Sequence, residues 1–303
     1  MRKEYQKQVR LLIQVMPFLS ATDQFALKGG TAINFFVRDL PRLSVDIDLT
    51  YLPVKSRADS LEMIKKGVEK IAQEAEKRIS GVQITSQKSG GTLSKLIIRT
   101  EDAQIKLEVN TVLRGSIYEA TERDLSSALQ EEFELFATVK TLSFEDLYAG
   151  KLCAALDRQH PRDLYDVRLL LNNEGITEDL RRAFIGYLIS HSRPINELLN
   201  PNAIDIEALY YNEFEGMTEE TNILDELIDV QKELPGILLG KLIDEEKEFL
   251  MSFKKGDPNW ELISIPGLEK LPGVQWKMLN IRKMDSDKHK AATKKLESVL
   301  FPK

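Results

Sequence analysis

The sequence predicts an α+β fold, with a small mixed β-sheet flanked by helices in residues 1–140 and a mostly helical bundle in residues 141–303. Segments in which apolar and polar residues alternate, as in half-buried strands, occur only in the first half of the chain. Apolar residues with helical spacing dominate the second half. Because 42% of the 303 residues are hydrophobic, the chain can bury a sizeable core. Its single cysteine excludes an intramolecular disulfide and a thiolate zinc site.

Helix and strand signals are mixed in residues 1–140. The clearest strand is Ser44–Thr50, whose apolar residues share one face and whose polar residues share the other. The turn Ser89-Gly90-Gly91 is a hairpin signal between two later strands. The other strands are expected at Val82–Gln87, Leu93–Arg99 and Ile105–Val112. Helices are expected at Glu4–Met16, Asp23–Ala26, Ala32–Arg38 and Arg57–Ile79.

Capping signals mark the helices of residues 141–303. Ser143, with Asp146 three residues later, is expected to cap a helix that reaches Arg158. Within it, Gly150 indicates the close approach of another element, since a mid-helix glycine costs about 1 kcal/mol relative to alanine. Pro161 opens the next helix, which is expected to reach Leu171. Further helices are expected at Thr177–Ser190, Thr218–Glu233, Pro235–Phe253 and Val274–Leu296.

Charge limits the ways in which this chain can meet a polyanion. With 42 Lys and Arg against 48 Asp and Glu, its net charge of −6 argues against a nucleic-acid binder that uses its whole surface. The candidate basic patch is the last helix, and a solvated lysine-rich helix is the alternative. Its basic residues are Lys277, Arg282, Lys283, Lys288, His289, Lys290, Lys294 and Lys295. Trp260 and Trp276 are expected to be packing anchors. No apolar run is long enough to span a membrane, and a cytoplasmic protein is expected.

Three carboxylates are the strongest candidates for chemistry. Asp46 and Asp48 lie two residues apart on the expected strand, so both emerge on its polar face. A divalent cation, Mg²⁺ or Mn²⁺, would offset their repulsion, and a solvated edge-strand face is the alternative. Glu108 lies on the polar face of another strand beside Lys106. It joins the aspartates if the two strands are neighbours, giving a cluster suited to two-metal phosphoryl transfer, and otherwise it pairs with a lysine across strands.

A glycine turn, Gly29-Gly30-Thr31, precedes the carboxylate strand by one short helix. Glycines let a phosphate approach the backbone, the free amides of a first helical turn point toward it, and Thr31 adds a hydroxyl. A turn without a ligand is the alternative. The connection to the strand has the right length for the turn and the carboxylates to form one pocket.

Charged residues recur at helical spacing in the second half. Lys151 and Arg158 are seven residues apart on one helix and therefore share a face. A cation on that face would neutralise the charge that develops on a leaving pyrophosphate, and exposure of Lys151 to solvent is the alternative. Asp163 and Asp166 follow on the next helix, where a capping role is the alternative for Asp163.

In this order, the motifs resemble those of the nucleotidyltransferases of the AbiEii/AbiGii toxin family, within the polymerase-β-like nucleotidyltransferase superfamily. The likeness begins with the glycine turn and with Arg42 through Asp48. It continues with Lys151, Arg158 and the segment Arg162-Asp163-Leu164-Tyr165-Asp166, and it ends with residues 260–278. Aspartate is common in this superfamily where this chain has Glu108, whose longer arm is expected to shift the geometry of metal binding.

The resemblance implies a nucleotidyltransferase fold in the first module and transfer of a nucleoside monophosphate from an NTP to a hydroxyl, with pyrophosphate leaving. It implies that Asp163 or Asp166 orients Lys151 or accepts the proton of the attacking hydroxyl. The implied metal ligands are Asp46, Asp48 and Glu108. The implied nucleotide-binding residues are Gly29, Gly30, Thr31, Arg42, Ser44, Lys151, Arg158 and Arg162.

The resemblance also implies a toxin of a bacterial toxin–antitoxin system of the type IV kind, or of a phage-defence pair. Its expected acceptor is a tRNA at the 3′ end or another RNA, and its expected partner is an antitoxin that acts without necessarily binding the toxin tightly. One alternative is a catalytically inactive nucleotide- or partner-binding module of the same fold. Another is a different D-x-D metal enzyme, such as a sugar-nucleotide glycosyltransferase, which leaves the motif at residues 162–166 unexplained.

Overall fold

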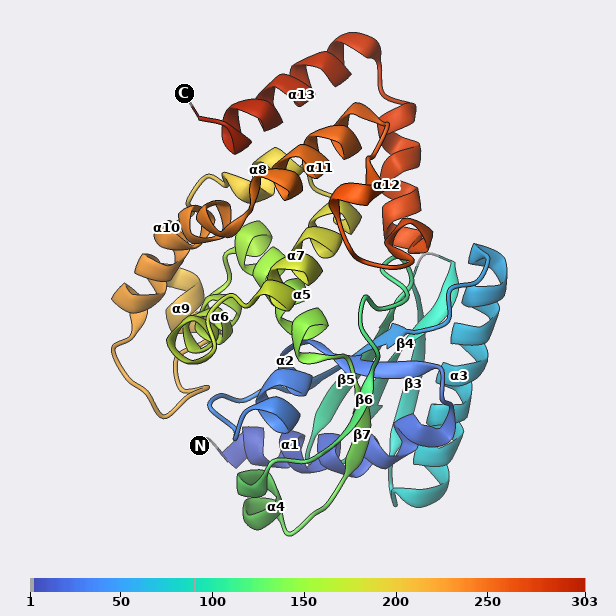
Figure 1. The fold of residues 1–303 in the computed structure, drawn as a ribbon. Helices are drawn as coiled ribbons and strands as arrows, with labels where there is room; N and C mark the ends of the chain where they lie inside the picture. Colours follow the sequence, from blue (N-terminus) through green and yellow to red (C-terminus); the bar gives the residue numbers. More distant parts are fainter. Residues whose placement is uncertain (1–2, 90, 303) are drawn as a thin grey trace. The chain divides into compact units, whose positions relative to one another are not determined.

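The structure, a computed structural model, describes residues 3–89 and 91–302 and confirms the α+β class (Figure 1). Two compact units form. The first extends to Leu147 and includes the later segment Glu215–Thr221, and the second comprises Tyr148–Phe214 and the chain from Asn222 onward. The sequence places the boundary after residue 140 and gives no sign of the later segment. The carbonyl of Met217 in that segment accepts a hydrogen bond from Leu43 N at 2.7 Å.

In its described part, the first unit is built on a mixed sheet of 7 strands in the order β3-β4-β5-β2-β1-β7-β6. The strands are β1 (Phe25–Lys28), β2 (Asp46–Tyr51), β3 (Gln83–Ser89), β4 (Thr92–Arg99), β5 (Gln104–Asn110), β6 (Thr121–Asp124) and β7 (Thr138–Thr141). Strand β2 pairs antiparallel with β1 and parallel with β5. The strand with both aspartates therefore lies directly beside the strand with Glu108.

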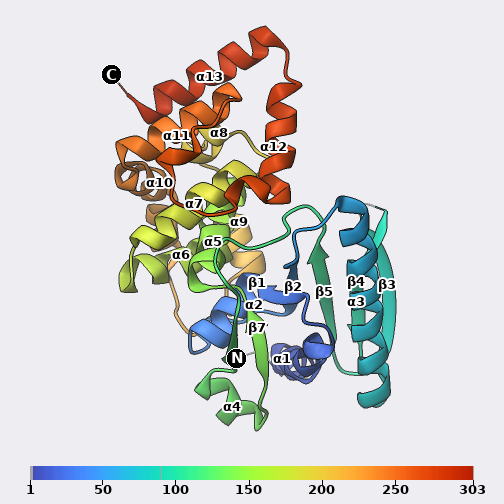
Figure 2. The same cartoon turned by 45° about the vertical axis from the view of Figure 1, so that its right-hand side comes forward.

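Two helices pack against this sheet. Helix α1 (Lys3–Val15) contacts β5, and helix α3 (Arg57–Arg78) contacts β4 and runs along the sheet in Figure 2. On β2 and β5, the residues Ile47, Leu49 and Leu107 are fully buried. Because successive strand side chains point to opposite faces, the acidic side chains of β2 and β5 emerge on the face away from this core. No helix in the described residues is both long enough and apolar enough to cross a membrane.

Most of the elements predicted for the first unit are present with ends shifted by a few residues, but short elements differ. The helix expected at Asp23–Ala26 is wrong, since this segment enters strand β1, and four residues are too few for periodicity to separate helix from strand. Strand β6 is mostly exposed and lacks apolar alternation, so no pattern predicted it. The elements without any predicted counterpart are β6, β7, α4 (Ser127–Phe133) and the 3₁₀ turn Met16–Ala21.

The two glycine-containing turns bear on predictions made from the sequence. The helix expected at Ala32–Arg38 begins earlier, as α2 (Gly29–Ala32), and continues as a π-helical turn over Ile33–Val37. The glycines therefore form the first turn of this helix. Gly90, in the predicted hairpin turn, lies outside the described residues.

Helices account for most of the rest of the chain. Ser143 Oγ accepts a hydrogen bond from Asp146 N at 3.0 Å, which confirms the predicted cap. A Cβ on Gly150 would lie 3.3 Å from the Tyr187 ring, so the predicted close approach is confirmed. The helices are α5 (Phe144–Arg158), α6 (Pro161–Asn173), α7 (Glu178–Ser190), α8 (Ile195–Leu199), α9 (Glu207–Glu213), α10 (Leu224–Lys241), α11 (Asp244–Lys255), α12 (Pro272–Arg282) and α13 (Ser286–Leu300), with 3₁₀ turns at Trp260–Leu262 and Leu268–Lys270.

Three helix boundaries predicted for this region are wrong. The helix expected to begin at Thr218 begins at Leu224 instead. Pro235 lies inside α10 and does not open a helix, because losing one backbone hydrogen bond does not end a helix whose buried Leu234 and Leu238 hold both sides of the proline. The last expected helix is two helices, α12 and α13. The Asp285 side chain accepts hydrogen bonds from Asp287 N and Lys288 N and so starts a new helix.

Candidate active site

The acidic residues of β2 and β5 lie side by side. In the parallel register, Asp46 is opposite Lys106 and Asp48 is opposite Glu108. All four side chains are partly exposed, while the residues between them in each strand are buried. The expectation that the two strands are neighbours is therefore confirmed, and the three carboxylates share one face of the sheet.

A lysine separates two of these carboxylates. Lys106 Nζ lies 3.9 Å from Asp46 Oδ2 and 3.5 Å from Glu108 Oε2. Its ammonium group offsets the repulsion that two neighbouring carboxylates would otherwise feel. On the other side of β2, Lys28 is opposite Asp48 in the antiparallel register with β1. Strand alternation placed Lys106 on the polar face, but no pattern in the sequence indicated that it would pair with both acids.

The donor set has the chemistry of a magnesium or manganese site, since carboxylate oxygens are the ligands that these hard cations prefer. In the part of the chain that the structure describes, no three acidic, histidine or cysteine side chains are already gathered closely enough to hold a metal ion. The charge that a cation would bring is supplied here by Lys106. The ligand types therefore fit a divalent cation, and the assignment of Asp46, Asp48 and Glu108 as its ligands stays a prediction.

The glycine turn touches the carboxylate strand. Gly29 has a φ of +74°, and a Cβ on it would lie 2.9 Å from Asp48 Oδ2. A Cβ on Gly30 would lie 2.7 Å from Arg42 Nη2 and 3.1 Å from Ser44 Oγ. All three distances are shorter than ordinary Cβ contacts. Each glycine therefore allows an approach that a larger residue would block.

Thr31, Ser44 and Arg42 link the turn to the residues that lead into β2. Thr31 Oγ1 makes hydrogen bonds with the Asp46 carbonyl oxygen at 2.5 Å and with Ser44 Oγ at 2.8 Å. Arg42 is buried, and its Nη1 donates to the Leu43 carbonyl at 2.7 Å. The structure thus brings together all eight residues singled out by sequence in the first unit: Gly29, Gly30, Thr31, Arg42, Ser44, Asp46, Asp48 and Glu108.

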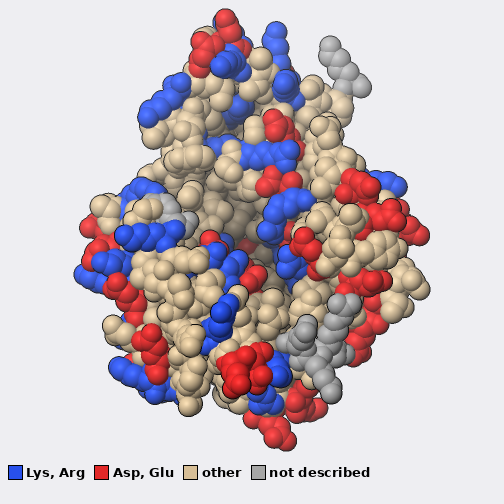
Figure 3. All heavy atoms as spheres, turned by 180° about the vertical axis from the view of Figure 1, so that it is seen from behind, with Lys and Arg blue, Asp and Glu red and all other residues tan. Residues whose placement is uncertain are grey.

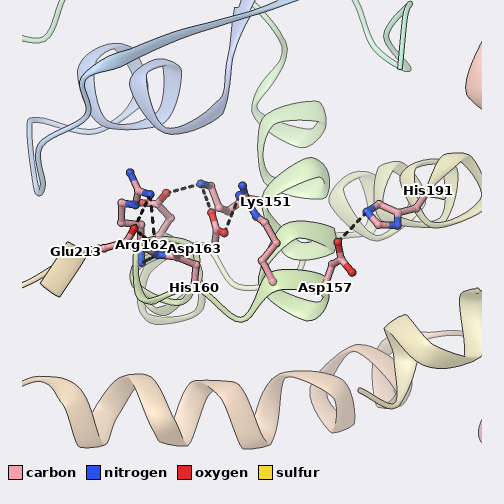
Figure 4. A network of polar contacts seen from close by, with 9 residues as sticks. Lys151, Asp157, His160, Arg162, Asp163, His191 and Glu213 are labelled. Carbon is pink, nitrogen blue, oxygen red and sulfur yellow. Dashed lines mark hydrogen bonds and ion pairs between the residues drawn. The ribbon is translucent and has the colours of Figure 1, made fainter. Parts of the chain in front are cut away.

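The second unit holds a buried ion-pair cluster around Lys151 (Figure 4). Lys151 Nζ lies 2.8 Å from Asp163 Oδ1 and 2.9 Å from Asp166 Oδ2. The side chains of Lys151, Asp163 and Asp166 are 7%, 4% and 0% exposed. The alternative in which Lys151 extends into solvent is therefore wrong, because the two aspartates hold its ammonium group inside the unit.

Arg158 completes this cluster from the solvent side. Its Nη2 donates to Asp163 Oδ2 at 2.8 Å, and its side chain is mostly exposed. Burial alone would raise the pKa of Asp163, but the charges of Lys151 and Arg158 outweigh burial and lower that pKa below its ordinary value. Asp163 is consequently held as a carboxylate at neutral pH.

A second set of polar contacts begins at His160, which caps α6. His160 Nδ1 accepts a hydrogen bond from Arg162 N at 3.1 Å, and His160 Nε2 lies 3.1 Å from Glu213 Oε2. Burial lowers the pKa of His160 despite the hydrogen bond to Glu213. Since Nδ1 is an acceptor, the neutral ring carries its proton on Nε2 and donates it to Glu213. Arg162 Nη2 lies 3.7 Å from the same carboxylate. Sequence reasoning missed His160 and Glu213, and only the position of His160 before Pro161 signalled a cap.

Charges of both signs are interspersed over the face of the molecule drawn in Figure 3, as expected for a chain with 42 Lys and Arg against 48 Asp and Glu. In the predicted basic patch, six side chains are exposed: Arg282, Lys283, Lys288, Lys290, Lys294 and Lys295. Lys277 is buried instead. Trp260 packs on Phe249 and Phe253 as expected, but Trp276 is exposed, so its prediction as a packing anchor is wrong.

Comparison with known proteins finds a matching family and a similar solved structure. The family model described as nucleotidyl transferase AbiEii toxin, type IV TA system, matches residues 10–233. Among solved structures, the chain is similar to MenT4, a nucleotidyltransferase toxin from Mycobacterium tuberculosis H37Rv, with a TM-score of 0.60 and 14% identity, covering 99% of this chain and 95% of that one. None of the curated protein sequences matches. At 14% identity, the structural likeness shows a common fold.

Proposed function

Because the chain belongs to the AbiEii nucleotidyltransferase toxin family of type IV toxin–antitoxin systems, we propose that it transfers a nucleoside monophosphate from an NTP to the 3′ end of a tRNA. As a nucleotidyltransferase toxin, it has an NTP as substrate and an antitoxin as partner. In the proposed step, an acceptor hydroxyl oxygen bonds to the α-phosphorus, the bond to pyrophosphate breaks, and the hydroxyl proton passes to water. We place the reaction in the cytoplasm, in defence against phage.

The observation that carries this proposal is the register of β2 and β5, with Gly29 against Asp48. It sets three carboxylates on one face, next to a turn whose two glycines let Asp48 and Arg42 approach the backbone closely. Asp46, Asp48 and Glu108 would hold Mg²⁺ or Mn²⁺, which supplies positive charge to the triphosphate and lowers the pKa of the acceptor hydroxyl. Thr31 and Ser44 supply hydroxyls, and the buried Arg42 supplies a cation close to Gly30.

In the proposed reaction, positive charge that stabilises the departing pyrophosphate comes from Lys151, Arg158 and Arg162. Asp163 is a weak base because its pKa is lowered, and both Asp163 and Asp166 contact Lys151. Of the two roles implied for these aspartates, we therefore favour that of orienting Lys151 over that of accepting the acceptor's proton.

The proposal is tested by incubating the protein with each α-³²P-labelled NTP, Mg²⁺ or Mn²⁺, and either purified tRNA or tRNA-depleted RNA. Label is expected in tRNA, from at least one NTP, and it should be absent when the 3′ hydroxyl has been oxidised with periodate. Label only in other RNA or in protein would overturn the acceptor. No label in RNA, protein or a small molecule from any NTP would overturn transfer itself and favour a binding module.

Replacing Gly29 by alanine is expected to lower the transfer rate by about 100-fold, since a shift of about 1 Å in a reacting group can cost that much. The new Cβ would lie 2.9 Å from Asp48 Oδ2, so the carboxylate or the turn must move. Gly81 is a matched control, with a φ of +71° and nothing within 4 Å of an added Cβ. Both variants should lose about 1–2 kcal/mol of unfolding free energy because alanine disfavours positive φ. Equal transfer rates in Gly29→Ala and Gly81→Ala would contradict the assignment of the turn.

A further inference from the structure

The second unit contains a pocket of about 110 Å³ beside α7, α8, α11 and α12. It is lined by apolar side chains together with Ser192, Lys254, Trp276, Lys277 and Asn280. A cavity needs only about 10–15 Å³ to hold one water, so this space admits a phosphate-sized anion but not a whole nucleotide. Its polar residues come from segments well separated in the sequence.

Lys254 lies at the end of α11 and is only 6% exposed. Within residues 3–89 and 91–302, no carboxylate or other acceptor contacts its side-chain nitrogen. Burial lowers the pKa of Lys254, and no neighbouring charge opposes that effect. No counter-ion in the described part of the chain pairs with this partly enclosed ammonium group, so an anion that enters the pocket can bind to it.

Lys277 adds a second cation to the same pocket. It is 8% exposed, and its Nζ donates to the carbonyls of His191 at 2.7 Å and Arg193 at 2.5 Å. These two hydrogen bonds leave one of its three ammonium protons for a ligand. Burial and then the charge of Lys254 lower the pKa of Lys277 to about 8, and Glu197 opposes them. Two lysines therefore repel each other in a space lined by no acidic residue.

Trp276 gives the pocket an aromatic rim. Its side chain, next to Lys277 in α12, is 41% exposed, and Met284 beside the pocket is also exposed. A large exposed aromatic ring next to buried cations has the character of a nucleobase platform, since every base offers a flat face for stacking. Asn280 and Ser192 supply neutral hydrogen-bonding groups.

From this arrangement we infer that the pocket binds the phosphate group of a nucleotide, with the phosphate between Lys254 and Lys277 and the base on Trp276. The pocket accepts the phosphate alone, so the base stays outside on the exposed ring. A free nucleoside monophosphate and a nucleotide within single-stranded RNA both offer this chemistry. The site shares no residue with the carboxylates of β2 and β5.

The test uses the full chain with Asp48→Ala, in EDTA, so that neither turnover nor metal-dependent nucleotide binding contributes. AMP, adenosine, inorganic phosphate and a five-nucleotide RNA are titrated by calorimetry and by tryptophan fluorescence. AMP is expected to bind at least tenfold more tightly than adenosine. Adding Lys254→Gln to this chain should weaken AMP binding at least tenfold. Adding Lys255→Gln instead, which removes an exposed neighbouring lysine, should leave the AMP affinity unchanged.

Trp276→Leu provides a second variant at an exposed position, where folding is not at stake. It should make AMP bind no more tightly than inorganic phosphate. Tighter binding of the RNA than of AMP identifies RNA as the source of the phosphate, and equal binding identifies the mononucleotide. Unchanged AMP affinity in both Lys254→Gln and Trp276→Leu, or no AMP binding at all, would overturn the site. Nucleotide transfer is measured separately, with the chain in which Asp48 is intact. A failure of the proposed transfer activity is therefore distinguished from a failure of the proposed phosphate pocket.

Discussion

Replacing Asp48 by alanine is expected to lower the rate of nucleotide transfer by about 1000-fold while leaving the chain folded. Asp48 contacts the glycine turn and lies opposite Glu108, so it belongs to both halves of the proposed phosphate and metal site. Loss of one group that stabilises charge in a transition state typically costs about 10²–10³-fold, and loss of a metal ligand adds to that cost. The side chain is only partly buried, so its removal should change the unfolding free energy little.

The measurement is the initial rate of labelled nucleotide incorporation into RNA, with thermal unfolding recorded on the same samples. Glu101→Ala is the matched control, because Glu101 is an exposed carboxylate in the turn between β4 and β5. It should retain the wild-type rate. If Asp48→Ala kept more than a tenth of that rate, the carboxylates of β2 would have no essential part in the reaction.

Replacing Lys151 by methionine is expected to lower the unfolding free energy by about 3–5 kcal/mol, the usual cost of removing one partner from a buried ion pair. Asp166 would keep a fully buried carboxylate without its lysine, whereas Asp163 would still contact Arg158. In the proposed function, transfer should fall as well, because the same ammonium group supplies charge to the pyrophosphate.

Urea denaturation measures the stability change, with Lys241→Met as a control at an exposed lysine near the end of α10. Asp166→Leu and the double variant Lys151→Met/Asp166→Leu complete a double-mutant cycle, which measures how much of the loss belongs to the contact between Lys151 and Asp166. Equal stability of Lys151→Met and Lys241→Met would show that the cluster contributes nothing to folding.

The candidate site in the first unit could be predicted in large part because strand alternation is a local property. The spacing of Asp46 and Asp48 fixed their common face, and the same alternation put Glu108 on the polar face of its own strand. That β5 is the parallel neighbour of β2 depends on how the whole sheet assembles. The alternation of apolar and polar residues within a strand does not depend on which strand lies beside it. The sequence therefore did not predict which strand pairs with β2.

Contacts between distant segments account for what the sequence did not predict. His160 and Glu213 are 53 residues apart, and no periodic pattern links them. Lys277 is buried although lysine is usually exposed, because the carbonyls of His191 and Arg193 accept its hydrogen bonds. Trp276 is exposed although tryptophan is usually well buried. Each outcome follows from tertiary packing, which local propensity does not encode.

Because Glu215–Thr221 belongs to the first unit, the protein cannot be divided into its two units by one cut in the chain. The polypeptide crosses between the units three times, so no single cleavage point yields two self-sufficient halves. A fragment ending at residue 147 would lose the Met217 carbonyl and leave the Leu43 amide, three residues before β2 begins, without its acceptor. Truncation would thus impair the very loop that leads into the aspartates, and recombinant work on this toxin needs the intact polypeptide.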